Sequence, residues 1–582
     1  MDTQRRDFDV IVAGGGPAGA TAAGYLAMMG YSVLVLEKCR FPRHQIGESL
    51  LPSMMPILED LGLYDTIAAQ NYPKKTGGTF IWGKGKEPWS VLFSSNPFLP
   101  HPHAYHVDRA KFDQIVLNNT ARLGAEVHEG EGVVAPIVED GRVVGVTART
   151  EDGTENTYRS RMVIDASGRA SVVGRQLTQR TFDPKMKQVA FWAYYDDCVG
   201  PEDEDISGHV IVESHRRGWS WYIPVESEGL GDVSVGIVSG QEFKEEFSEM
   251  GPQAFFESCL EDTPMTKKML GPNAVRVSEV DTITDWAYTC DRMAGHGFLL
   301  AGDAACFLDP LLSTGVSMAM LAGYSAAVAT NTAFQTPELE DRAIAFYDGN
   351  YKRMWDMTKD FLHYFYAGNA TAYPEDIFWT ARKTLKLGDN VGARQAFCFL
   401  VNTIPGNPHP ALRKQIHMFT QFMDHMEHPM EAFAEDADLQ AMTDDRKEDY
   451  VSVDEITDDV VPRINGQIEE ALQIDGDDQL LKPIRGVTYD TDRPIFSNSA
   501  SWLLGRNIHE LDDETLDTMA YFNGVDTWGE VVQRYASDHD LGTEEADGAL
   551  RAIVRPLDAE KLVLLRKGGA GAACGDVQPE AA

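Results

Sequence analysis

The chain has 582 residues, 43% of them hydrophobic and 10% aromatic, which is enough to build the cores of roughly two or three globular domains. The 90 acidic residues outnumber the 51 basic ones and give a formal net charge of −39, so nucleic acids and anionic membranes are poor partners. The seven cysteines are scattered and form no C-x-x-C pair, which excludes a disulfide framework and indicates no metal site.

A strand–helix–strand unit opens the chain. Residues 8–13 predict a buried strand, a helix is expected to end near residue 29, and residues 31–36 predict a second strand. The turn between the first strand and the helix carries the G-x-G-x-x-G fingerprint at Gly14, Gly16 and Gly19, and Ala18 is also expected to contact the cofactor. Such glycines serve a tight turn, close approach to a pyrophosphate and close helix–strand packing, so this unit is interpreted as a dinucleotide site.

The ribose end of this site is expected where the second strand ends. Glu37 occupies the position at which an acid binds ribose hydroxyls, and Lys38 follows it. The free N–H groups at the start of the helix face the phosphates.

Two later segments favour FAD over NAD. Residues 162–169 predict a strand that enters an Asp-Ala-Ser-Gly turn, and residues 297–305 predict a strand that ends in Gly302-Asp303. In glutathione-reductase-like flavoproteins, such a Gly-Asp pair places a carboxylate on the ribityl chain of the flavin. Asp303 taken alone is also compatible with a helix cap, but the three segments in this order predict an FAD-binding fold.

A long apolar helix is expected from residue 317 to about residue 330, and small residues precede it. The backbone N–H groups of such a start are accessible and attract negative charge. We therefore expect the pyrimidine end of the flavin and a nearby anion at Ser313, Thr314, Gly315 and Val316. The alternative interpretation is an ordinary structural start of a helix.

Two tryptophans lie close together in a predicted strand over residues 218–224. Trp219 and Trp221 are two positions apart, so strand alternation puts both side chains on one face. They are either ordinary aromatic residues of the core or a wall that keeps a substrate away from the flavin. A wall of this kind implies an oxidant that travels.

These segments resemble the flavin-dependent halogenases of the type that includes the chloramphenicol-pathway enzyme and the pyrrole-carrier-protein halogenases. The resemblance covers roughly residues 8–370. Its motifs are the glycine-rich turn, Phe41-Pro42-Arg43, the segment from Gly47 to Pro52, the segment from Asn71 to Lys75, His106-Val107-Asp108-Arg109, and the W-x-W-x-I-P segment that begins at Trp219. Several of these also occur in flavin monooxygenases, whereas the double tryptophan and the lysine segment favour a halogenase.

The resemblance implies a reaction. Reduced FAD and O2 oxidise chloride or bromide, bound near Ser313, Thr314 and Gly315, to hypohalous acid. The acid then meets Lys75, which orients it by hydrogen bonding or traps it as a haloamine, and burial would lower the pKa of this amine. Lys74 is adjacent, but Lys75 aligns with the lysine of the family. No second dinucleotide fingerprint is present, so FADH2 is expected from a separate flavin reductase.

The resemblance also suggests roles for other polar residues. Glu48 is expected near the flavin, where it assists proton transfer or positions the substrate, although an acid favoured by a helix start is the alternative. Arg43, Ser49 and Arg109 are predicted to bind FAD.

The mode of flavin attachment stays open. In the chloramphenicol-pathway enzyme an aspartate in the corresponding segment bonds covalently to the flavin, and Asp285 matches it by its spacing to Asp303. Most relatives hold FAD non-covalently, and the second acid of the family segment is replaced here by Thr289.

The predicted fold class is α/β, α+β overall: a glutathione-reductase-like, Rossmann-type FAD-binding domain with an inserted β-sheet substrate domain and a mainly helical C-terminal region. The expected bounds are 1–75, 100–185 and 275–335 for the FAD domain, 76–99 and 186–274 for the substrate-side sheet, 336–520 for a helical covering region, 521–566 for a small winged-helix-like module and 567–582 for a disordered tail. The polar N-terminus and the lack of a long uncharged apolar run predict a cytoplasmic protein.

The leading hypothesis is an FAD-dependent halogenase of secondary-metabolite (antibiotic) biosynthesis. Its substrate is expected to be an electron-rich phenol or pyrrole, or an activated acyl carbon, free or tethered to a carrier protein. The alternatives are a flavin-dependent monooxygenase that hydroxylates an aromatic substrate, and a non-catalytic flavoprotein that docks partners through its acidic C-terminal region. Lys75 and the tryptophan pair argue against both alternatives.

Overall fold

The computed structural model describes residues 6–83, 86–95, 101–227, 230–370, 372–382, 409–410, 451–464, 467–488, 508–559 and 562–567. The chain divides into two compact units. The first contains Met1–Glu427 and Ile474–Leu481, and the second contains His428–Gln473 and Lys482–Ala582. Among the described residues, no helix combines the length and the hydropathy that a bilayer crossing requires.

The first unit contains an eight-stranded sheet with five parallel strands in the order β18 (Phe298–Leu300), β10 (Glu155–Asp165), β1 (Arg6–Ala13), β2 (Val33–Glu37) and β7 (Glu126–Glu129). The antiparallel strands β8 (Glu131–Glu139), β9 (Arg142–Thr150) and β17 (Ala294–Gly295) complete it. The predicted Rossmann-type fold is confirmed. Strands β2 and β18 and the carboxyl-terminal half of β1 are near-continuous apolar runs because helices cover the faces of the sheet there.

Three helices bring the functional segments to this sheet. Helix α1 (Pro17–Met28) connects β1 to β2 and packs against α9 (Gly315–Gln335), while α4 (Arg109–Arg122) packs on the other side of α1. The carboxyl ends of β1, β10 and β18 meet at one edge of the sheet, which is where ligands bind in open α/β folds. The glycine-rich turn, the Asp-Ala-Ser-Gly turn and Gly302-Asp303 therefore converge there.

The second sheet of the first unit has nine strands. Its order is β19 (Cys306–Phe307), β16 (Asp281–Cys290), β11 (Arg180–Asp196), β14 (Gly231–Gly240), β13 (Gly218–Ser227), β12 (His209–His215), β4 (Gly77–Ile81) and β5 (Pro88–Leu92), and β15 (Val275–Arg276) also pairs with β11. Strands β16 and β19 belong to this sheet, although the sequence analysis assigned 275–335 to the FAD domain. Strand patterns reveal a strand but not its distant partner, which is why that assignment was wrong here.

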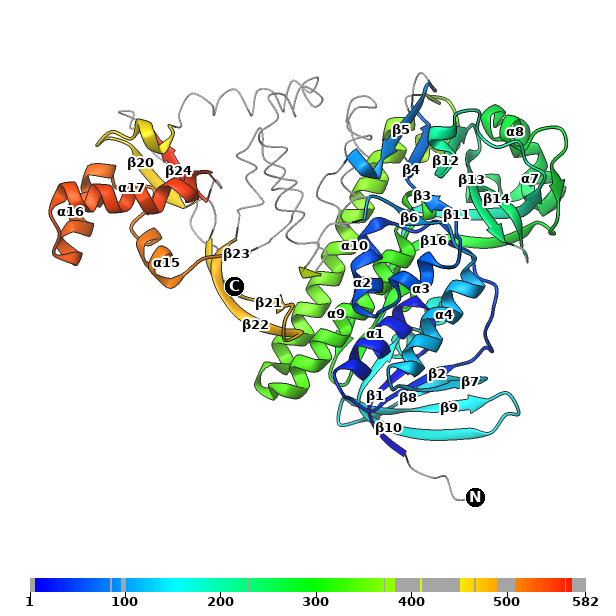
Figure 1. Ribbon diagram of the computed structural model, residues 1–582, viewed down its shortest axis with the longest axis horizontal. Coiled ribbons are helices and arrows are strands. Elements are labelled where there is room, and N and C mark those ends of the chain that lie inside the picture. Colours follow the sequence, from blue (N-terminus) through cyan, green and yellow to red (C-terminus); the bar gives the residue numbers. More distant parts are fainter. Residues whose placement is uncertain are drawn as a thin grey trace. The chain divides into compact units, whose positions relative to one another are not determined.

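Helices cover the second sheet on both sides. The buried cluster that includes Phe191 and Tyr222 packs against Phe255 of α7 (Pro252–Glu261), and α8 (Pro264–Leu270) lies beside it. The opposite face meets α10 (Glu340–Ala370), through Trp219 and Tyr366. Figure 1 shows α10 running from the level of the first sheet to the level of the second.

The region 336–520 is not helical throughout, contrary to the prediction. Helices α10 and α11 (Ile377–Ala381) begin it, but β20 (Val461–Ile464), β21 (Gln467–Asp475), β22 (Leu480–Thr488) and β23 (Ile508–Glu510) follow. Strands β21, β22 and β23 form one sheet. Strands β21 and β22 are neighbours in this sheet and are joined by a short turn in which Gln479 has a φ of 52°.

The second unit has its own core around Trp528 and Leu550. Helices α15 (Asp513–Met519), α16 (Trp528–His539) and α17 (Thr543–Ala559) lead to β24 (Val563–Arg566), in the helix, helix, strand order that was predicted. However, β24 pairs with β20, and Val453 also packs in this core, so the module is not confined to 521–566. The tail predicted over 567–582 lies, beyond Lys567, outside the described residues.

Candidate active site

The glycine-rich turn is packed too tightly for side chains. Gly14 has a φ of +103°, and a Cβ there would lie 2.4 Å from the carbonyl oxygen of Ala166. A Cβ on Gly19 would lie 2.0 Å from the carbonyl oxygen of Gly14. Ala18 approaches α9 so closely that a Cβ on Gly323 would lie 2.3 Å from its carbonyl oxygen. These contacts fit a turn that brings the backbone up to a pyrophosphate.

Charged residues surround this turn. Arg43 lies next to Gly16, since a Cβ on that glycine would be 3.3 Å from Arg43 Nη2. Glu37 is 5% exposed, and its carboxylate accepts hydrogen bonds from the backbone N–H groups of Gly15, at 2.8 Å, and Cys39, at 2.9 Å. A cation beside the turn and an acid at the end of β2 are what the phosphates and the ribose of a dinucleotide require. Lys38 is exposed.

Asp303 lies at the junction of α1 and α9. A Cβ on Gly302 would lie 3.1 Å from Cβ of Ala18 and 3.4 Å from Cβ of Ala319. A small hollow, partly open to solvent, adjoins this junction and is lined by Gly302, Asp303, Cys306, Phe307, Leu308, Gly315, Met318 and Tyr351. The structure thus brings the predicted flavin residues Asp303 and Gly315 to one hollow.

Three arginines act on Asp303. Burial raises the pKa of this carboxyl above its usual value, and the guanidinium groups of Arg169, Arg109 and Arg180 lower it. Sequence reasoning missed Arg169 and Arg180 as site residues. A signal existed for Arg169, which directly follows the Asp-Ala-Ser-Gly turn, but none marked Arg180.

Arg109 braces the loop before Glu48. Its Nε and Nη2 donate to both carboxylate oxygens of Asp113 at 2.8 and 2.9 Å, and its Nη1 donates to the carbonyls of Ile46 and Gly47 at 3.0 and 3.1 Å. These hydrogen bonds use all of its nitrogens within the protein. Its direct contact with FAD stays a prediction.

The start of α9 is shaped for a ligand. Ser313 adopts a left-handed conformation with a φ of +57°, and Thr314 is 2% exposed. A Cβ added to Gly315 would meet nothing within 4 Å, so the surface above this residue is open. A Cβ on Gly47 would lie 4.0 Å from Cγ2 of Val316, which places the loop that carries Glu48 beside this helix start.

Glu48 is a buried carboxyl beside the tryptophan motif. It is 1% exposed, and its Oε1 accepts a hydrogen bond from the Tyr194 hydroxyl at 2.6 Å. Burial raises the pKa of Glu48 to about 7, although the hydrogen bond from Tyr194, the nearby Ser234 hydroxyl and the charge of Arg109 lower it. Its Oε2 has no hydrogen-bond partner within the described part of the chain, and the same is true of Ser49 Oγ, which is also buried.

Lys75 is buried, whereas Lys74 is exposed. Strand β3 (Lys74–Lys75) pairs with β6 (Ala104–Tyr105), and alternation turns the Lys75 side chain inward, where it is 1% exposed. Its Nζ makes no hydrogen bond to any described residue and lies 5.7 Å from the centre of the Phe93 ring. Burial lowers the pKa of Lys75 to about 7. The structure therefore separates the two lysines that the sequence left adjacent.

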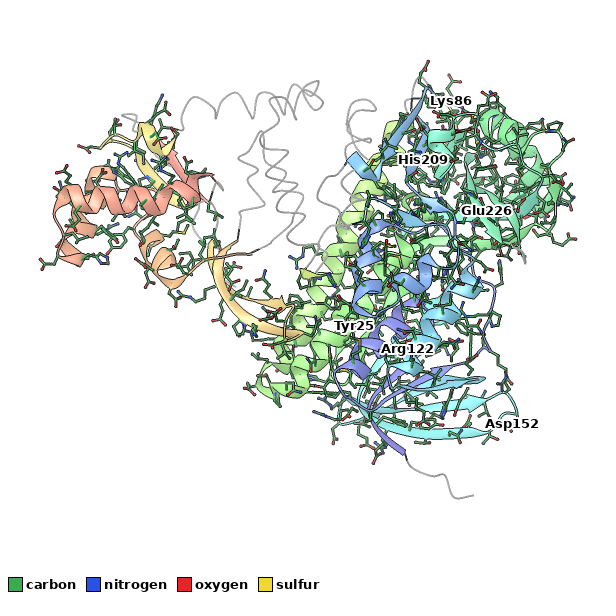
Figure 2. The ribbon with its side chains drawn as sticks, in the orientation of Figure 1. Tyr25, Lys86, Arg122, Asp152, His209 and Glu226 are labelled. Carbon is green, nitrogen blue, oxygen red and sulfur yellow. The ribbon has the colours of Figure 1, made fainter. Side chains whose placement is uncertain are left out.

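Two buried histidines stand near Lys75. Burial and the charge of Lys75 lower the pKa of His106 well below its usual value and that of His209 to about 4. His106 Nδ1 and His209 Nε2 have no hydrogen-bond partner among the described residues. Figure 2 labels His209 on the second sheet, far from Asp152 on the first. Unpartnered buried polar atoms of this kind occur at catalytic sites and at sites of bound water.

Trp219 and Trp221 occupy one face of β13, as predicted from the alternation. Their ring centres are 6.1 Å apart, and Trp221 lies over Gly236, where a Cβ would be 2.1 Å from the indole. Trp221 Nε1 donates to Ser234 Oγ at 3.2 Å. Trp219 Nε1 donates to the Tyr366 hydroxyl at 2.7 Å.

Tyr366 joins the tryptophan motif to the loop before α9. Its hydroxyl donates to Asp309 Oδ2 at 2.8 Å and accepts from Gln188 Nε2 at 2.8 Å as well as from Trp219. Asp309 Oδ1 in turn accepts from the backbone N–H of Leu311 at 2.9 Å. Sequence reasoning missed Tyr366, because nothing in a helical segment indicates a polar contact with a distant strand.

Asp285 lies in β16 and pairs with Gln188 of β11. Its side chain is outside the described part of the structure, so the predicted flavin link is untested.

Comparison with known proteins identifies the class. A family model described as tryptophan halogenase matches residues 9–100 and 94–442. The chain is 34% identical over 377 residues to tryptophan 2-halogenase of Chondromyces crocatus, which covers 64% of this chain and 70% of that protein. It is 33% identical over 344 residues to sulochrin halogenase gedL of Aspergillus terreus, which covers 55% and 62% of the two chains.

Solved structures of flavin-dependent halogenases are also similar to this chain. The chondrochloren halogenase CndH, described as a variant of FAD-dependent halogenases from a myxobacterium, is 34% identical with a TM-score of 0.62 and covers 71% of this chain and 96% of its own. The flavin-dependent halogenase CmlS is 26% identical with a TM-score of 0.70 and covers 98% of both chains. The chain belongs to the flavin-dependent halogenase family. It is an oxidoreductase that uses FAD, and the residues around the glycine-rich turn and Asp303 fit that cofactor.

Proposed function

We propose that this halogenase converts chloride or bromide to hypohalous acid and relays it through Lys75 to an electron-rich carbon of its substrate. Bound FAD, reduced and supplied with O2, provides the oxidising power. We infer that a separate flavin reductase supplies FADH2, because the sequence contains no second dinucleotide fingerprint.

The burial of Lys75 is the observation that carries this proposal. An amine that is 1% exposed, has a pKa of about 7 and lacks a hydrogen-bond partner among the described residues is half neutral near pH 7. The neutral amine attacks hypohalous acid to form a haloamine and water, whereas the ammonium orients the acid by hydrogen bonding. Both roles need the amine in a pocket from which bulk water is excluded.

Trp219 and Trp221 serve as the wall between the flavin and the substrate in this proposal. Their support is their burial and their anchoring on one face of β13, through Ser234 and Tyr366. Glu48 assists proton transfer beside this wall. Side chains held by packing and by hydrogen bonds exclude a substrate without moving.

We place the halide at the start of α9, with Ser313, Thr314 and Gly315. The Gly315→Ala variant is expected to raise the KM for halide or the Kd for FAD by about tenfold, since a methyl group would occupy space that is open in the protein. Gly349→Ala in α10 is the control, because its Cβ also meets nothing within 4 Å. Steady-state halide titration and FAD titration check this. If the KM for halide and the Kd for FAD were unchanged in Gly315→Ala, the halide site would not lie at the start of α9.

The substrate is proposed to be an electron-rich aromatic ring, a phenol or a pyrrole. The relatives' names support a ring substrate, since they specify tryptophan and sulochrin. An activated acyl carbon is the alternative to a ring. A substrate tethered to a carrier protein is disfavoured, because carrier proteins are usually acidic and this chain has a net charge of −39.

Covalent attachment of FAD at Asp285 is tested by denaturation. Purified protein is precipitated with acid, and the flavin in the pellet is compared with that in the supernatant. Covalent attachment predicts flavin in the pellet of the wild-type protein and none in the pellet of Asp285→Ala. Release of all flavin from the wild-type protein would remove Asp285 from this role.

A product assay tests the proposed function. The purified chain is supplied with FAD, a flavin reductase, NADH, O2 and chloride or bromide, with phenolic, pyrrole and monochlorodimedone-type acceptors. Mass spectra are expected to show products that carry the halogen and that disappear when the halide is omitted. Products that are only hydroxylated would contradict the proposal and favour a monooxygenase.

A further inference from the structure

Three side chains form a hydrogen-bonded path from the interior to solvent. The Tyr194 hydroxyl donates to Glu48 Oε1 at 2.6 Å, and His44 Nε2 lies 3.1 Å from the same hydroxyl oxygen. Glu48 is 1% exposed, whereas His44 is exposed. The path therefore starts at a buried carboxyl and ends at an exposed imidazole.

The buried end of this path lies beside the tryptophan motif. Tyr194 of β11 pairs with Ser234 of β14, and Ser234 Oγ accepts the indole N–H of Trp221. The second carboxyl oxygen of Glu48, Oε2, is buried and has no partner within the described residues. One oxygen of Glu48 thus receives a hydrogen bond from the path, while the other is available to the pocket.

The proposed reaction needs such a path. Its balance is RH + X⁻ + O2 + FADH2 + H⁺ → RX + FAD + 2 H2O, so each turnover consumes one proton. A site walled by buried aromatic residues cannot take that proton directly from bulk water. The inference rests on the proposed function in this respect.

We propose that His44, Tyr194 and Glu48 form the route by which the proton enters. Glu48 gives its carboxyl proton to the oxygen that leaves as water and becomes a carboxylate. The Tyr194 O–H then passes its proton to Glu48 Oε1, while the protonated imidazole of His44 passes the proton on Nε2 to the Tyr194 oxygen. His44, now neutral, takes a proton from solvent, so every group regains its proton, and rotation of the Glu48 carboxyl and the Tyr194 hydroxyl restores the starting hydrogen bonds. An imidazole has two ring nitrogens, so it can take up a proton on one and donate a proton from the other, which suits the outer position.

The charged surroundings keep the Tyr194 hydroxyl protonated between turnovers. The pKa of Glu48, about 7, leaves part of the carboxyl protonated at neutral pH. Arg109 lowers this pKa and Asp108 raises it. The pKa of Tyr194 is raised by burial and by the carboxylates of Glu48, Asp108 and Asp281. Tyr194 therefore stays protonated at rest, and it donates its proton to Glu48 only as it receives another from His44.

The His44→Ala variant gives the sharpest test. His44 contacts Tyr194 and not Glu48, so its loss leaves the buried carboxyl in place. At pH values above 7, where free protons are scarce, halogenation is expected to slow on the order of tenfold. Imidazole added to the medium is expected to restore the rate in a saturable way. Wild-type protein is assayed in parallel. If it gave no halogenated product, the proposed function would be refuted. If His44→Ala halogenated at the wild-type rate, only the proton route would be refuted.

A measurement on the protein without FAD tests the hydrogen bond between Tyr194 and Glu48, which is the buried part of the path. Infrared spectra of the cofactor-free protein, with the Glu48 band assigned by its loss in Glu48→Gln, are expected to show a carboxyl that titrates near pH 7. Tyr194→Phe is expected to shift this band and to slow its exchange with deuterium. Tyr195→Phe is the control, because Tyr195 belongs to the buried cluster on the opposite face of β11. An identical Glu48 band in Tyr194→Phe and wild type would overturn the route.

Discussion

Replacing Lys75 with alanine is expected to lower the yield of halogenated product at least about 100-fold while FADH2 oxidation continues. The reason is that the substrate-side amine is removed, whereas the residues that hold FAD, around Gly14 and Asp303, are untouched. The measurement compares halogenated product with FADH2 consumed in the same reaction, by mass spectrometry and absorbance.

Lys74→Ala is the matched control, because the neighbouring lysine is exposed on the same two-residue strand. It is expected to halogenate at the wild-type rate. Lys75→Arg separates the two roles of the amine: a guanidinium stays charged, so it can donate a hydrogen bond but cannot form a haloamine at neutral pH. If Lys75→Ala retained full halogenation, the relay through this residue would be wrong.

Replacing Lys75 with methionine is expected to stabilise the cofactor-free protein at pH 7 by roughly 3–5 kcal/mol, because methionine fills a similar volume without a charge. The figure follows from the fall of the pKa of this amine from 10.5 to about 7 on folding. Urea unfolding of the first unit, followed at several pH values, measures the difference between the variant and the wild-type protein.

The pH dependence of this difference identifies its cause. Between pH 7 and 10.5 the unfolded chain holds a proton on Lys75 that the folded chain lacks, so the stability of the wild-type protein rises with pH relative to the variant. The advantage of Lys75→Met is therefore largest at and below pH 7 and shrinks toward pH 10.5. A difference that does not depend on pH would show that the amine is solvated in the folded protein. A buried amine that costs stability is typical of a functional site.

The sequence was sufficient to predict the flavin fold because its signals are local. The glycine-rich turn, Glu37 and Gly302-Asp303 each lie within or directly after a strand, and parallel strands bring such turns to one edge. The shared face of Trp219 and Trp221 follows from strand alternation in the same way. Lys75 was preferred to Lys74 only through the family resemblance, and its inward direction became visible in the structure.

Contacts between distant segments could not be predicted. Tyr366 lies 147 positions from Trp219, and Tyr194 lies 146 positions from Glu48. Nothing near these tyrosines in the sequence indicates a polar partner, because both are surrounded by residues that suit a buried core. The domain of β16 was predicted wrongly for the same reason, because its pairing with β11, a distant strand, places it in the second sheet.

The most direct test of the central claim, that the oxidant travels, is a crystal structure of this chain with FAD and a substrate bound. We expect the indoles of Trp219 and Trp221 to stand between the isoalloxazine ring and Lys75, with Lys75 Nζ directed at the substrate. A structure in which the substrate contacts the isoalloxazine ring, or in which Lys75 Nζ points away from the substrate, would contradict it.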